Sequence, residues 1–459
     1  MTEELKQQLE TKFRFRLNKN QWKDIKRLFY EIGRRDNIGY EDIIERLNKN
    51  TSIQKAEGKN KFLVIKRDLI NTRFPLTSKK EVIGAKRVFL TEIKKPYPAN
   101  YKCSLPFTPE TVYVEKNAKG SYLEKRFRNK FPDTNIEIID YYSNYIKSHK
   151  FSPAELKKPL IFIVKESWDF IKPCPCTKGH LGCNYWIFNL GMGCPFDCSY
   201  CFLQAYSNFP GIILPSNLDD FFNKFGDFYK KINRRIRIGT GEFCDSLALD
   251  DITGYSLKLI DFFKDKNVYF ELKTKSDNIK NILSSKPGSN IIISWSLNPQ
   301  PIVEKEEVCS VSLKKRLEAA KKVQNKGFPV AFHFDPIIHA PGWDNLYKKV
   351  VDMLYQEIKS PFMWISLGTL RGPRQLKNVA ERRFKNSNIF YGELLIGKDK
   401  KLRYPKFIRK QIYKNMVKWI RVHDTKTPVY LCMEDEDTWS VMDKQFISSR
   451  EIEKYLISP

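Results

Sequence analysis

The sequence predicts an α/β protein built on a partial parallel (β/α)6 barrel, preceded by a mainly helical, basic accessory region. From about residue 200 onward, short apolar runs rich in β-branched and aromatic residues alternate with longer amphipathic stretches. This alternation is typical of repeated β/α units. The 459 residues are 41% hydrophobic and 14% aromatic, which is enough apolar material for one large core and an accessory unit.

Six apolar runs are the candidate strands of the barrel, and amphipathic stretches between them are candidate helices. The predicted strands cover 185–190, 235–241, 268–274, 290–297, 329–335 and 362–368. The helical patterns cover 250–266, 312–327 and 343–358, each beginning or ending with cap-like residues. Polar residues follow every predicted strand, from Glu242 to Arg371. Because parallel barrels carry their chemistry at the C-terminal ends of the strands, we expect a site at this edge.

The first 108 residues differ in character from the rest. Helical patterns at 20–35 and 40–49 precede lysine-rich, less periodic sequence. We therefore expect a basic accessory region at 1–108 and a catalytic core at 109–459. The accessory region either binds a nucleic-acid backbone through lysine and arginine with interleaved aromatic residues, or is a solvent-exposed set of helices without a binding role.

The charge and the cysteines limit the setting in which the protein acts. Lysine and arginine number 81 against 53 acidic residues, a formal charge of +28, which favours a polyanionic partner such as DNA or RNA unless the whole proteome is lysine-rich. No N-terminal stretch has the order of a signal peptide, and the apolar run at 159–164 is too short to span a bilayer. We expect a cytoplasmic protein without a membrane partner. In that reducing compartment, clustered members of the ten cysteines should be metal ligands or catalysts and not a disulfide framework.

One loop, "NLGMGCPFDCSYCFLQAY" at residues 189–206, places Cys194, Cys198 and Cys201 close together. A structural zinc site needs four ligands, and a reactive dithiol needs only two cysteines. Three thiolates suit a [4Fe-4S] cluster with one iron left open for a small chelating cofactor. Glycines at 191 and 193 would let the loop backbone turn tightly around such a cluster.

The spacing C-x3-C-x2-C, with an aromatic residue just before the last cysteine, is the signature of the radical S-adenosylmethionine (SAM) superfamily. The cluster loop at 191–206 also resembles that of the spore photoproduct lyase family, and the likeness continues in "RIGTGEFCDSLALD" and in "KRLEAAKKVQNKGFPVAFHFDPIIHAPGW". It covers roughly residues 110–370, extends more weakly to about 440, and leaves the first hundred residues uncovered. The resemblance implies a radical SAM carbon–carbon lyase that repairs a thymine-dimer-type photolesion in DNA.

The resemblance also implies which residues hold the cofactors. Cys194, Cys198 and Cys201 would ligate the cluster, while SAM chelates the fourth iron through its amino and carboxyl groups. An electron, from a donor such as flavodoxin or ferredoxin, would then cleave SAM to methionine and a 5'-deoxyadenosyl radical that abstracts a substrate hydrogen.

Four further positions match SAM contacts of the family. Lys273 corresponds to a lysine that reaches the SAM carboxylate, and a cation suits that role. Ser246 and Ser296 correspond to hydroxyl groups around the methionine moiety, and Tyr200 lies where an aromatic residue packs near SAM. The non-functional alternatives are that Lys273 is an ordinary surface lysine and that Ser296 is a strand-end hydroxyl hydrogen-bonded within the protein.

Cys244 falls at the position of the cysteine that returns a hydrogen atom to the substrate radical in the family. Its surroundings, "GTGEFCDSLALD", are bulkier than the family pattern, so a buried and inert thiol is the alternative. His333 and Asp335 are expected either to contact the adenosine or the substrate, or to pair with each other.

A second cysteine cluster, "PCPCTKGHLGC" at 173–183, departs from the family pattern. Cys174, Cys176 and Cys183 with His180 either complete a zinc or auxiliary iron site or are buried thiols beneath the cluster loop.

Three functions remain open from the sequence alone. The first is a radical SAM lyase acting on damaged DNA, which must extrude a base to reach a buried site. The second is a radical SAM enzyme that modifies RNA or a protein, recognised through the N-terminal region. The third is a non-enzymatic nucleic-acid binder with a structural cluster, for which three cysteines are a poor ligand set.

Overall fold

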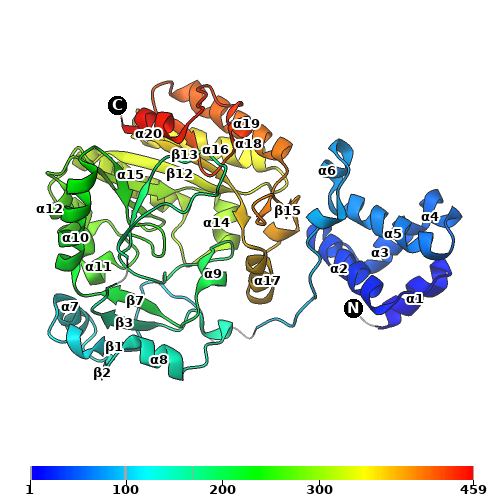
Figure 1. Ribbon diagram of the computed structural model, residues 1–459, viewed down its shortest axis with the longest axis horizontal. Helices are drawn as coiled ribbons and strands as arrows, with labels where there is room; N and C mark the ends of the chain where they lie inside the picture. Colours follow the sequence, from blue (N-terminus) through cyan, green and yellow to red (C-terminus); the bar gives the residue numbers. More distant parts are fainter. Residues whose placement is uncertain (1–2, 98–100, 168, 458–459) are drawn as a thin grey trace. The chain divides into compact units, whose positions relative to one another are not determined.

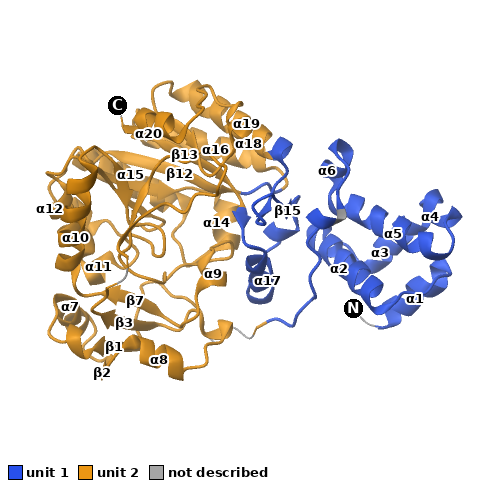
Figure 2. Ribbon diagram, in the orientation of Figure 1, with its two compact units in different colours: residues 1–96, 338–340, 371–408 blue, residues 97–337, 341–370, 409–459 orange. Residues whose placement is uncertain are grey.

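The computed structural model describes residues 3–97, 101–167 and 169–457. The chain forms two compact units (Figure 2). The first comprises residues 1–96, 338–340 and 371–408, and the second comprises 97–337, 341–370 and 409–459. The helical unit thus includes a segment from late in the sequence. The expected division of function at residue 108 remains a proposal.

The first unit is mainly helical, as the sequence predicts. Its N-terminal helices are α1 (Glu3–Phe13), α2 (Lys19–Asp36), α3 (Tyr40–Asn48), α4 (Thr51–Lys55), α5 (Gly58–Arg73), α6 (Pro75–Lys80) and the short η1 (Ala85–Arg87). The late segment adds β14 (Arg371–Gly372), α17 (Arg374–Arg383), η4 (Ile389–Tyr391), β15 (Leu395–Ile396) and β16 (Leu402–Arg403). Helix α2 begins with a capping box between Asn18 and Gln21, and its buried Ile25, Leu28 and Phe29 lie in the core of the unit.

A buried ion cluster joins the late segment to the N-terminal helices of this unit. Glu31 Oε1 accepts from Arg27 Nε at 2.6 Å and from Lys377 Nζ at 2.5 Å, and Glu31 Oε2 accepts from Arg73 Nε at 2.6 Å. Burial would raise the pKa of Glu31, but the charges of Lys377, Arg27 and Arg73 hold it well below its usual range. Since Lys377 lies on α17, removing this carboxylate would loosen the attachment of that helix.

The second unit contains an eight-stranded sheet with the order β17-β13-β12-β10-β9-β8-β5-β4. Its strands are β4 (Ile171–Pro173), β5 (Trp186–Phe188), β8 (Arg237–Gly239), β9 (Tyr269–Thr274), β10 (Ile291–Ser296), β12 (Val330–Ile337), β13 (Ile365–Thr369) and β17 (Val429–Leu431). All neighbours from β5 to β17 pair in parallel, and only β4 is antiparallel. The six predicted strands are therefore confirmed as consecutive neighbours, and the α/β half-barrel is the observed fold (Figure 1).

The described part of the second unit also contains helices. They are η2 (Lys116–Ala118), α7 (Tyr122–Lys130), α8 (Tyr142–Ser148), η3 (Pro153–Glu155), α9 (Leu203–Tyr206), α10 (Leu218–Ile232), α11 (Asp250–Thr253), α12 (Tyr255–Phe263), α13 (Lys280–Ser284), α14 (Gln300–Glu306), α15 (Leu313–Lys326), α16 (Trp343–Glu357), α19 (Glu436–Trp439) and α20 (Ser449–Ile457), while α18 (Lys406–His423) begins at the end of the first unit. The predicted helix at 250–266 is wrong as a single element, because Gly254 adopts φ +62° and ends α11 before α12 begins.

A second parallel sheet was not predicted from the sequence. It has the order β2-β1-β3-β7, formed by Asn135–Ile139, Thr111–Glu115, Leu160–Val164 and Ile212–Pro215. The run at 159–164 supplies its fully buried strand β3, and continuous apolar runs are typical of strands covered on both faces. The described residues also form two small antiparallel sheets: one pairs β11 (Glu307–Val308) with β6 (Asp197–Cys198), and the other pairs β16 with both β14 and β15. In the described part of the chain, no helix is both long and apolar enough to cross a membrane.

Candidate active site

The second sheet holds the backbone of the cluster loop. Met192 and Ile213 of β7 exchange backbone hydrogen bonds of 3.1 and 2.8 Å. Gly193 adopts φ +102°, and a Cβ atom there would lie 2.7 Å from the carbonyl oxygen of Gly211. A glycine is required at 193 because the neighbouring strand leaves no room for a side chain and because this φ is strained for other residues.

Side chains outside the cysteine motif fix the carbonyl groups of the loop. Lys157 Nζ donates to the Cys194 oxygen at 2.9 Å and to the Phe196 oxygen at 2.6 Å. Gln204 Nε2 donates to Asp197 Oδ1 at 2.8 Å and to the Cys198 oxygen at 3.1 Å. The loop conformation is therefore set by the protein itself.

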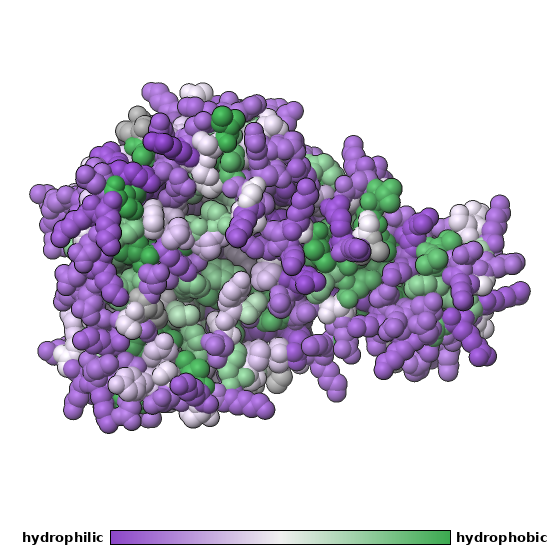
Figure 3. All heavy atoms as spheres, viewed as in Figure 1, coloured by the Kyte–Doolittle hydropathy of each residue, from purple (hydrophilic) through white to green (hydrophobic). Residues whose placement is uncertain are grey.

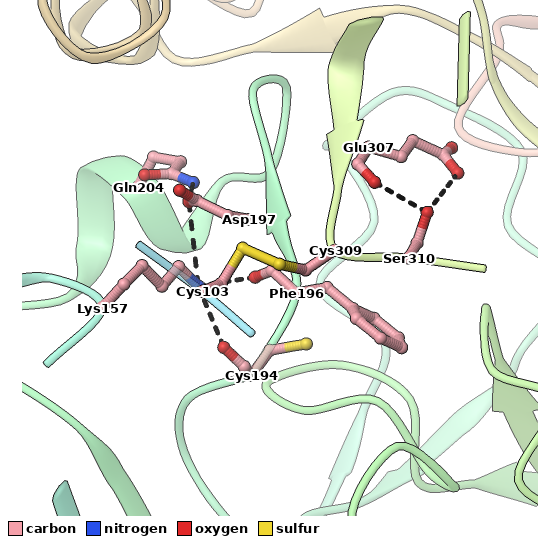
Figure 4. The surroundings of a disulfide bond; sticks show 9 residues. All are labelled: Cys103, Lys157, Cys194, Phe196, Asp197, Gln204, Glu307, Cys309 and Ser310. Atoms are coloured by element: carbon pink, nitrogen blue, oxygen red, sulfur yellow. Dashed lines mark hydrogen bonds and ion pairs between the residues drawn. A yellow bond between two sulfur atoms is a disulfide. The ribbon is translucent and has the colours of Figure 1, made fainter. Parts of the chain in front are cut away.

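The β6–β11 pairing brings a distant segment against the cluster loop. Cys198 pairs with Glu307, and the Ser199 amide donates to the Glu306 oxygen at 2.8 Å. Directly after β11, Cys309 forms a disulfide with Cys103, 206 positions away (Figure 4). The expectation that the cysteines form no disulfide framework did not foresee this bond, because nothing in the local spacing indicates a partner so distant.

The three cluster thiols lie in a buried environment. Burial raises the pKa of Cys194 to about 12 and raises those of Cys198 and Cys201, with smaller contributions from neighbouring cysteines and acids. Across the described ranges, no three Cys, His, Asp or Glu side chains converge closely enough to hold a metal ion. By chemistry the donor set still fits an iron–sulfur cluster: three soft thiols share one loop, and nearby Lys157 and Lys275 favour the thiolate forms that iron requires. A bound cluster would draw the three sulfur atoms together.

Behind the loop, Tyr200 belongs to a buried polar network centred on Glu307. Its hydroxyl donates to Glu307 Oε1, which also accepts from Asn298 Nδ2 at 2.8 Å. Arg316 forms an ion pair with Glu307 Oε2 and donates to the Ser296 carbonyl oxygen at 2.9 Å. The Glu307 and Arg316 side chains are both 0% exposed. This network ties the cluster loop to the end of β10.

Cys244 lies in a loop that touches the cluster loop directly. The Gly193 amide donates to the Phe243 carbonyl oxygen at 3.0 Å. Asp245 holds the conformation, since its carboxylate accepts from Thr274 Oγ1 at 2.6 Å and from the Lys275 amide at 2.8 Å. Burial raises the pKa of the Cys244 thiol far above neutrality, with a contribution from Cys194, so its sulfur keeps its hydrogen.

The remaining predicted SAM contacts lie at neighbouring strand ends. Ser246 Oγ is 2.6 Å from Thr240 Oγ1 and accepts from the Lys273 amide at 3.1 Å. Ser296 is buried at the end of β10. Lys275, two residues beyond Lys273, lies beside the cluster loop, with Nζ 5.8 Å from the centre of the Tyr200 ring.

Two alternatives were open for the second cysteine cluster, and among the described residues its side chains do not converge as a four-ligand metal site. The Cys174 and Cys176 thiols are hydrogen-bonded to each other, and Cys183 contacts Arg237. His180 Nδ1 lies 3.4 Å from the carbonyl oxygen of Lys178, away from these thiols.

The segment around these cysteines instead ties β5, near one edge of the barrel, to the C-terminal part of the chain. The Leu181 amide donates to the Glu434 oxygen, the Gly182 amide to Ser449 Oγ and Asn184 Nδ2 to Glu453 Oε2, each at 2.9 Å. Because the sheet does not close on itself, this segment supplies part of the missing wall.

His333 contacts an acid other than the expected one. Its Nε2 lies 2.7 Å from Glu271 Oε1, and Tyr185 Oη donates to Glu271 Oε2 at 2.6 Å. Burial lowers the pKa of His333 despite the opposing charge of Glu271. The pairing of His333 with Glu271 replaces the alternative of a pair with Asp335.

Several supporting residues were missed by sequence reasoning. No motif or characteristic spacing in the sequence indicates a role for Glu307 or Arg316. Lys157 lies outside the cluster loop in sequence, although its side chain donates to carbonyl oxygens of that loop. A buried acid with a buried base nine residues later is not distinguishable in sequence from a surface pair. Only Asp245 had a local indication, since aspartate often accepts from nearby backbone amides in turns.

Comparisons with known proteins identify relatives of this chain. The family model described as spore photoproduct lyase matches residues 107–422. The chain is 24% identical over 297 residues to spore photoproduct lyase of Bacillus subtilis (strain 168), covering 62% of this chain and 84% of that protein. It is 26% identical over 301 residues to the enzyme of Geobacillus sp. (strain Y412MC61), covering 62% and 85%.

Solved structures share the fold. A spore photoproduct lyase complexed with dinucleoside spore photoproduct matches with a TM-score of 0.63 and 21% identity, over 71% of this chain and 99% of that chain. A mutant with bound AdoMet and dinucleoside spore photoproduct matches with a TM-score of 0.62 over the same shares. The first 106 residues lie outside the family match.

Proposed function

The chain belongs to the spore photoproduct lyase family of radical SAM lyases, and on that premise we propose that it repairs a thymine-dimer-type photolesion in DNA. Relatives in the comparisons carry AdoMet and dinucleoside spore photoproduct. The observation that carries the proposal is the hydrogen bond of 3.0 Å from the Gly193 amide to the Phe243 oxygen. It supports a site in which a hydrogen donor, Cys244, lies one residue from a direct contact with the cofactor loop.

We assign the cofactor contacts to the residues that the fold gathers at the strand ends. Cys194, Cys198 and Cys201 hold a [4Fe-4S] cluster, which when bound supplies the electron for reductive cleavage of SAM to a hydrogen-abstracting radical. Both Lys273 and Lys275 are cations for the SAM carboxylate, because residues two apart on a strand end project to the same face.

Hydroxyl and aromatic groups complete the SAM site in this proposal. Ser246 and Ser296 orient the methionine moiety. Tyr200 packs against the cofactor while its hydroxyl remains bound to Glu307. Burial of Tyr200 and Ser296 would help to exclude water from the reacting atoms.

Cys244 returns hydrogen to the substrate in this proposal. The S–H bond breaks homolytically, a C–H bond forms on the thymine carbon, and the unpaired electron remains on sulfur. This step requires a neutral thiol, and burial supports that form at Cys244. An anionic thiolate could not donate a hydrogen atom.

We place the reaction in the cytoplasm, with DNA as substrate and a flavodoxin or ferredoxin as electron donor. The same core could modify RNA or a protein instead. One observation favours that second candidate: the first 106 residues lie outside the family match and could recognise another substrate.

The proposal is tested with the full chain after anaerobic reconstitution of the cluster. The enzyme is incubated with SAM, dithionite and ultraviolet-irradiated DNA that carries spore-type thymine dimers. We expect 5'-deoxyadenosine and restored thymine, and neither from the Cys198→Ala control. Cleavage of SAM without restored thymine, in both duplex DNA and the isolated dinucleoside lesion, would overturn the proposed substrate.

A further inference from the structure

The positive charge of the protein is concentrated in the helical unit. Residues 1–96, 338–340 and 371–408 contain 35 Lys and Arg against 16 Asp and Glu, a formal +19. The second unit contains 46 against 37, a formal +9. Fewer than a third of the residues thus carry two thirds of the net charge. Figure 3 shows mainly hydrophilic side chains on the visible face of this unit.

Two segments far apart in sequence meet on the surface of this unit. Arg382 Nε on α17 donates to the Lys95 carbonyl oxygen at 2.9 Å. The Arg374 guanidinium, at the other end of α17, lies 5.7 Å from the centre of the Phe89 ring. Helix α17 therefore runs along the segment 86–95, and the basic residues of both segments share one surface.

A shallow hollow of about 170 Å³ lies between these segments. Its lining combines the Tyr30 ring, Ile93 and Pro96 with Lys94, Glu92, Asn378, Glu381 and Arg382. One of the two acids is already neutralised, since Glu381 Oε2 accepts from Arg27 NH1 at 2.9 Å. Glu92 is exposed at the rim.

We define the basic face as Lys94, Lys95, Arg374 and Arg382. Lys94, Lys95 and Arg374 are exposed, and Arg382 is partly buried. This set consists of long cationic side chains with an aromatic ring beside them. Such a surface suits a repeating anion.

We propose that the basic face binds the phosphate backbone of duplex DNA and holds it for the lyase core. The choice of DNA over RNA rests on the proposed function. Lysines on an extended segment and the arginines Arg374 and Arg382 of α17 can contact phosphates without entering a groove, so the binding is independent of sequence. The contacts of Arg382 with Lys95 and of Arg374 with Phe89 hold the two halves of the face together.

The test uses the full chain without cluster and a fluorescent, undamaged duplex of 20 base pairs, titrated at several KCl concentrations. The variant Lys94→Glu/Lys95→Glu/Arg374→Glu should bind at least tenfold more weakly at 100 mM KCl. Its slope of log affinity against log salt should flatten by about 2 to 3, because each lost phosphate contact removes about 0.9.

A matched control changes the charge equally on the second unit. Lys230→Glu/Lys264→Glu/Lys314→Glu replaces three exposed lysines there and should change DNA affinity less than threefold. Equal weakening by both triple variants would overturn the proposal, because net charge alone would then explain the binding. Tighter binding of a duplex RNA than of the DNA would overturn the choice of DNA.

A further comparison separates this inference from the proposed function. The basic-face variant should repair an isolated dinucleoside lesion at the wild-type rate and repair the same lesion in a duplex at least tenfold more slowly at subsaturating DNA. A wild-type enzyme that repairs neither substrate refutes the proposed function, while the binding experiment still decides the role of the basic face.

Discussion

The ion pair between Glu307 and Arg316 supports the cluster loop, and its removal should be costly. In Glu307→Gln the Arg316 charge stays fully buried, while Tyr200 and Asn298 lose a charged acceptor. Removing one partner of a buried ion pair typically costs about 3–5 kcal/mol. We therefore expect the free energy of unfolding to fall by about that amount, which changes the ratio of folded to unfolded protein by on the order of 10² to 10³.

Urea unfolding of the cluster-free protein at pH 7.5, followed by circular dichroism, measures this loss. The matched control is Glu304→Gln, an exposed acid on α14, the helix that directly precedes β11, for which we expect a change below about 0.5 kcal/mol. The double variant Glu307→Leu/Arg316→Met should recover most of the stability, because apolar residues of similar size remove both charges. A loss below about 1 kcal/mol for Glu307→Gln would refute the assignment of a tightly coupled buried pair.

Four further outcomes follow from the site and the fold. Cys198→Ala should lose cluster absorbance and SAM cleavage, because two thiolates cannot hold the cubane, whereas Cys432→Ala should retain both. Cys244→Ala should still cleave SAM and open the lesion but yield abnormal thymine adducts, detected by mass spectrometry. If the variant yields only normal thymine, Cys244 is not the hydrogen donor but a packed thiol, whose replacement by alanine lowers the free energy of unfolding by about 1 kcal/mol. Cys309→Ser should lower stability by up to about 5 kcal/mol under oxidising conditions, because the disulfide closes a long loop, and make no difference in excess dithiothreitol. Glu31→Gln should lower the free energy of unfolding, measured by urea titration, at pH values above 4.5, the ordinary pKa of a glutamate. The difference from wild type should shrink as the pH falls below 4.5, because folding lowers the pKa of Glu31 and the stability gained from its charge is lost on protonation. A difference that grows on acidification would contradict this sign.

The sequence by itself determined the parallel strands and the cluster loop. Both are local patterns: the strands β5, β8, β9, β10, β12 and β13 are short apolar runs between turns, and three cysteines within 194–201 need no partner elsewhere to be recognised. The tight backbone at Gly193 was also indicated, since glycine is the residue that adopts φ +102° without strain. These features depend on side-chain spacing along one segment, which sequence displays directly.

Only the tertiary structure decided what surrounds that loop. Glu31 and Lys377 are 346 positions apart, and Cys103 and Cys309 are 206 apart, so no periodicity links them. The same holds for His333, which the sequence left between adenosine contact and Asp335, and which the fold brings to Glu271 from another strand. Pairings of this kind depend on which strands become neighbours and how side chains share a buried volume. They are set by packing and desolvation, which act on distances in space and not along the chain.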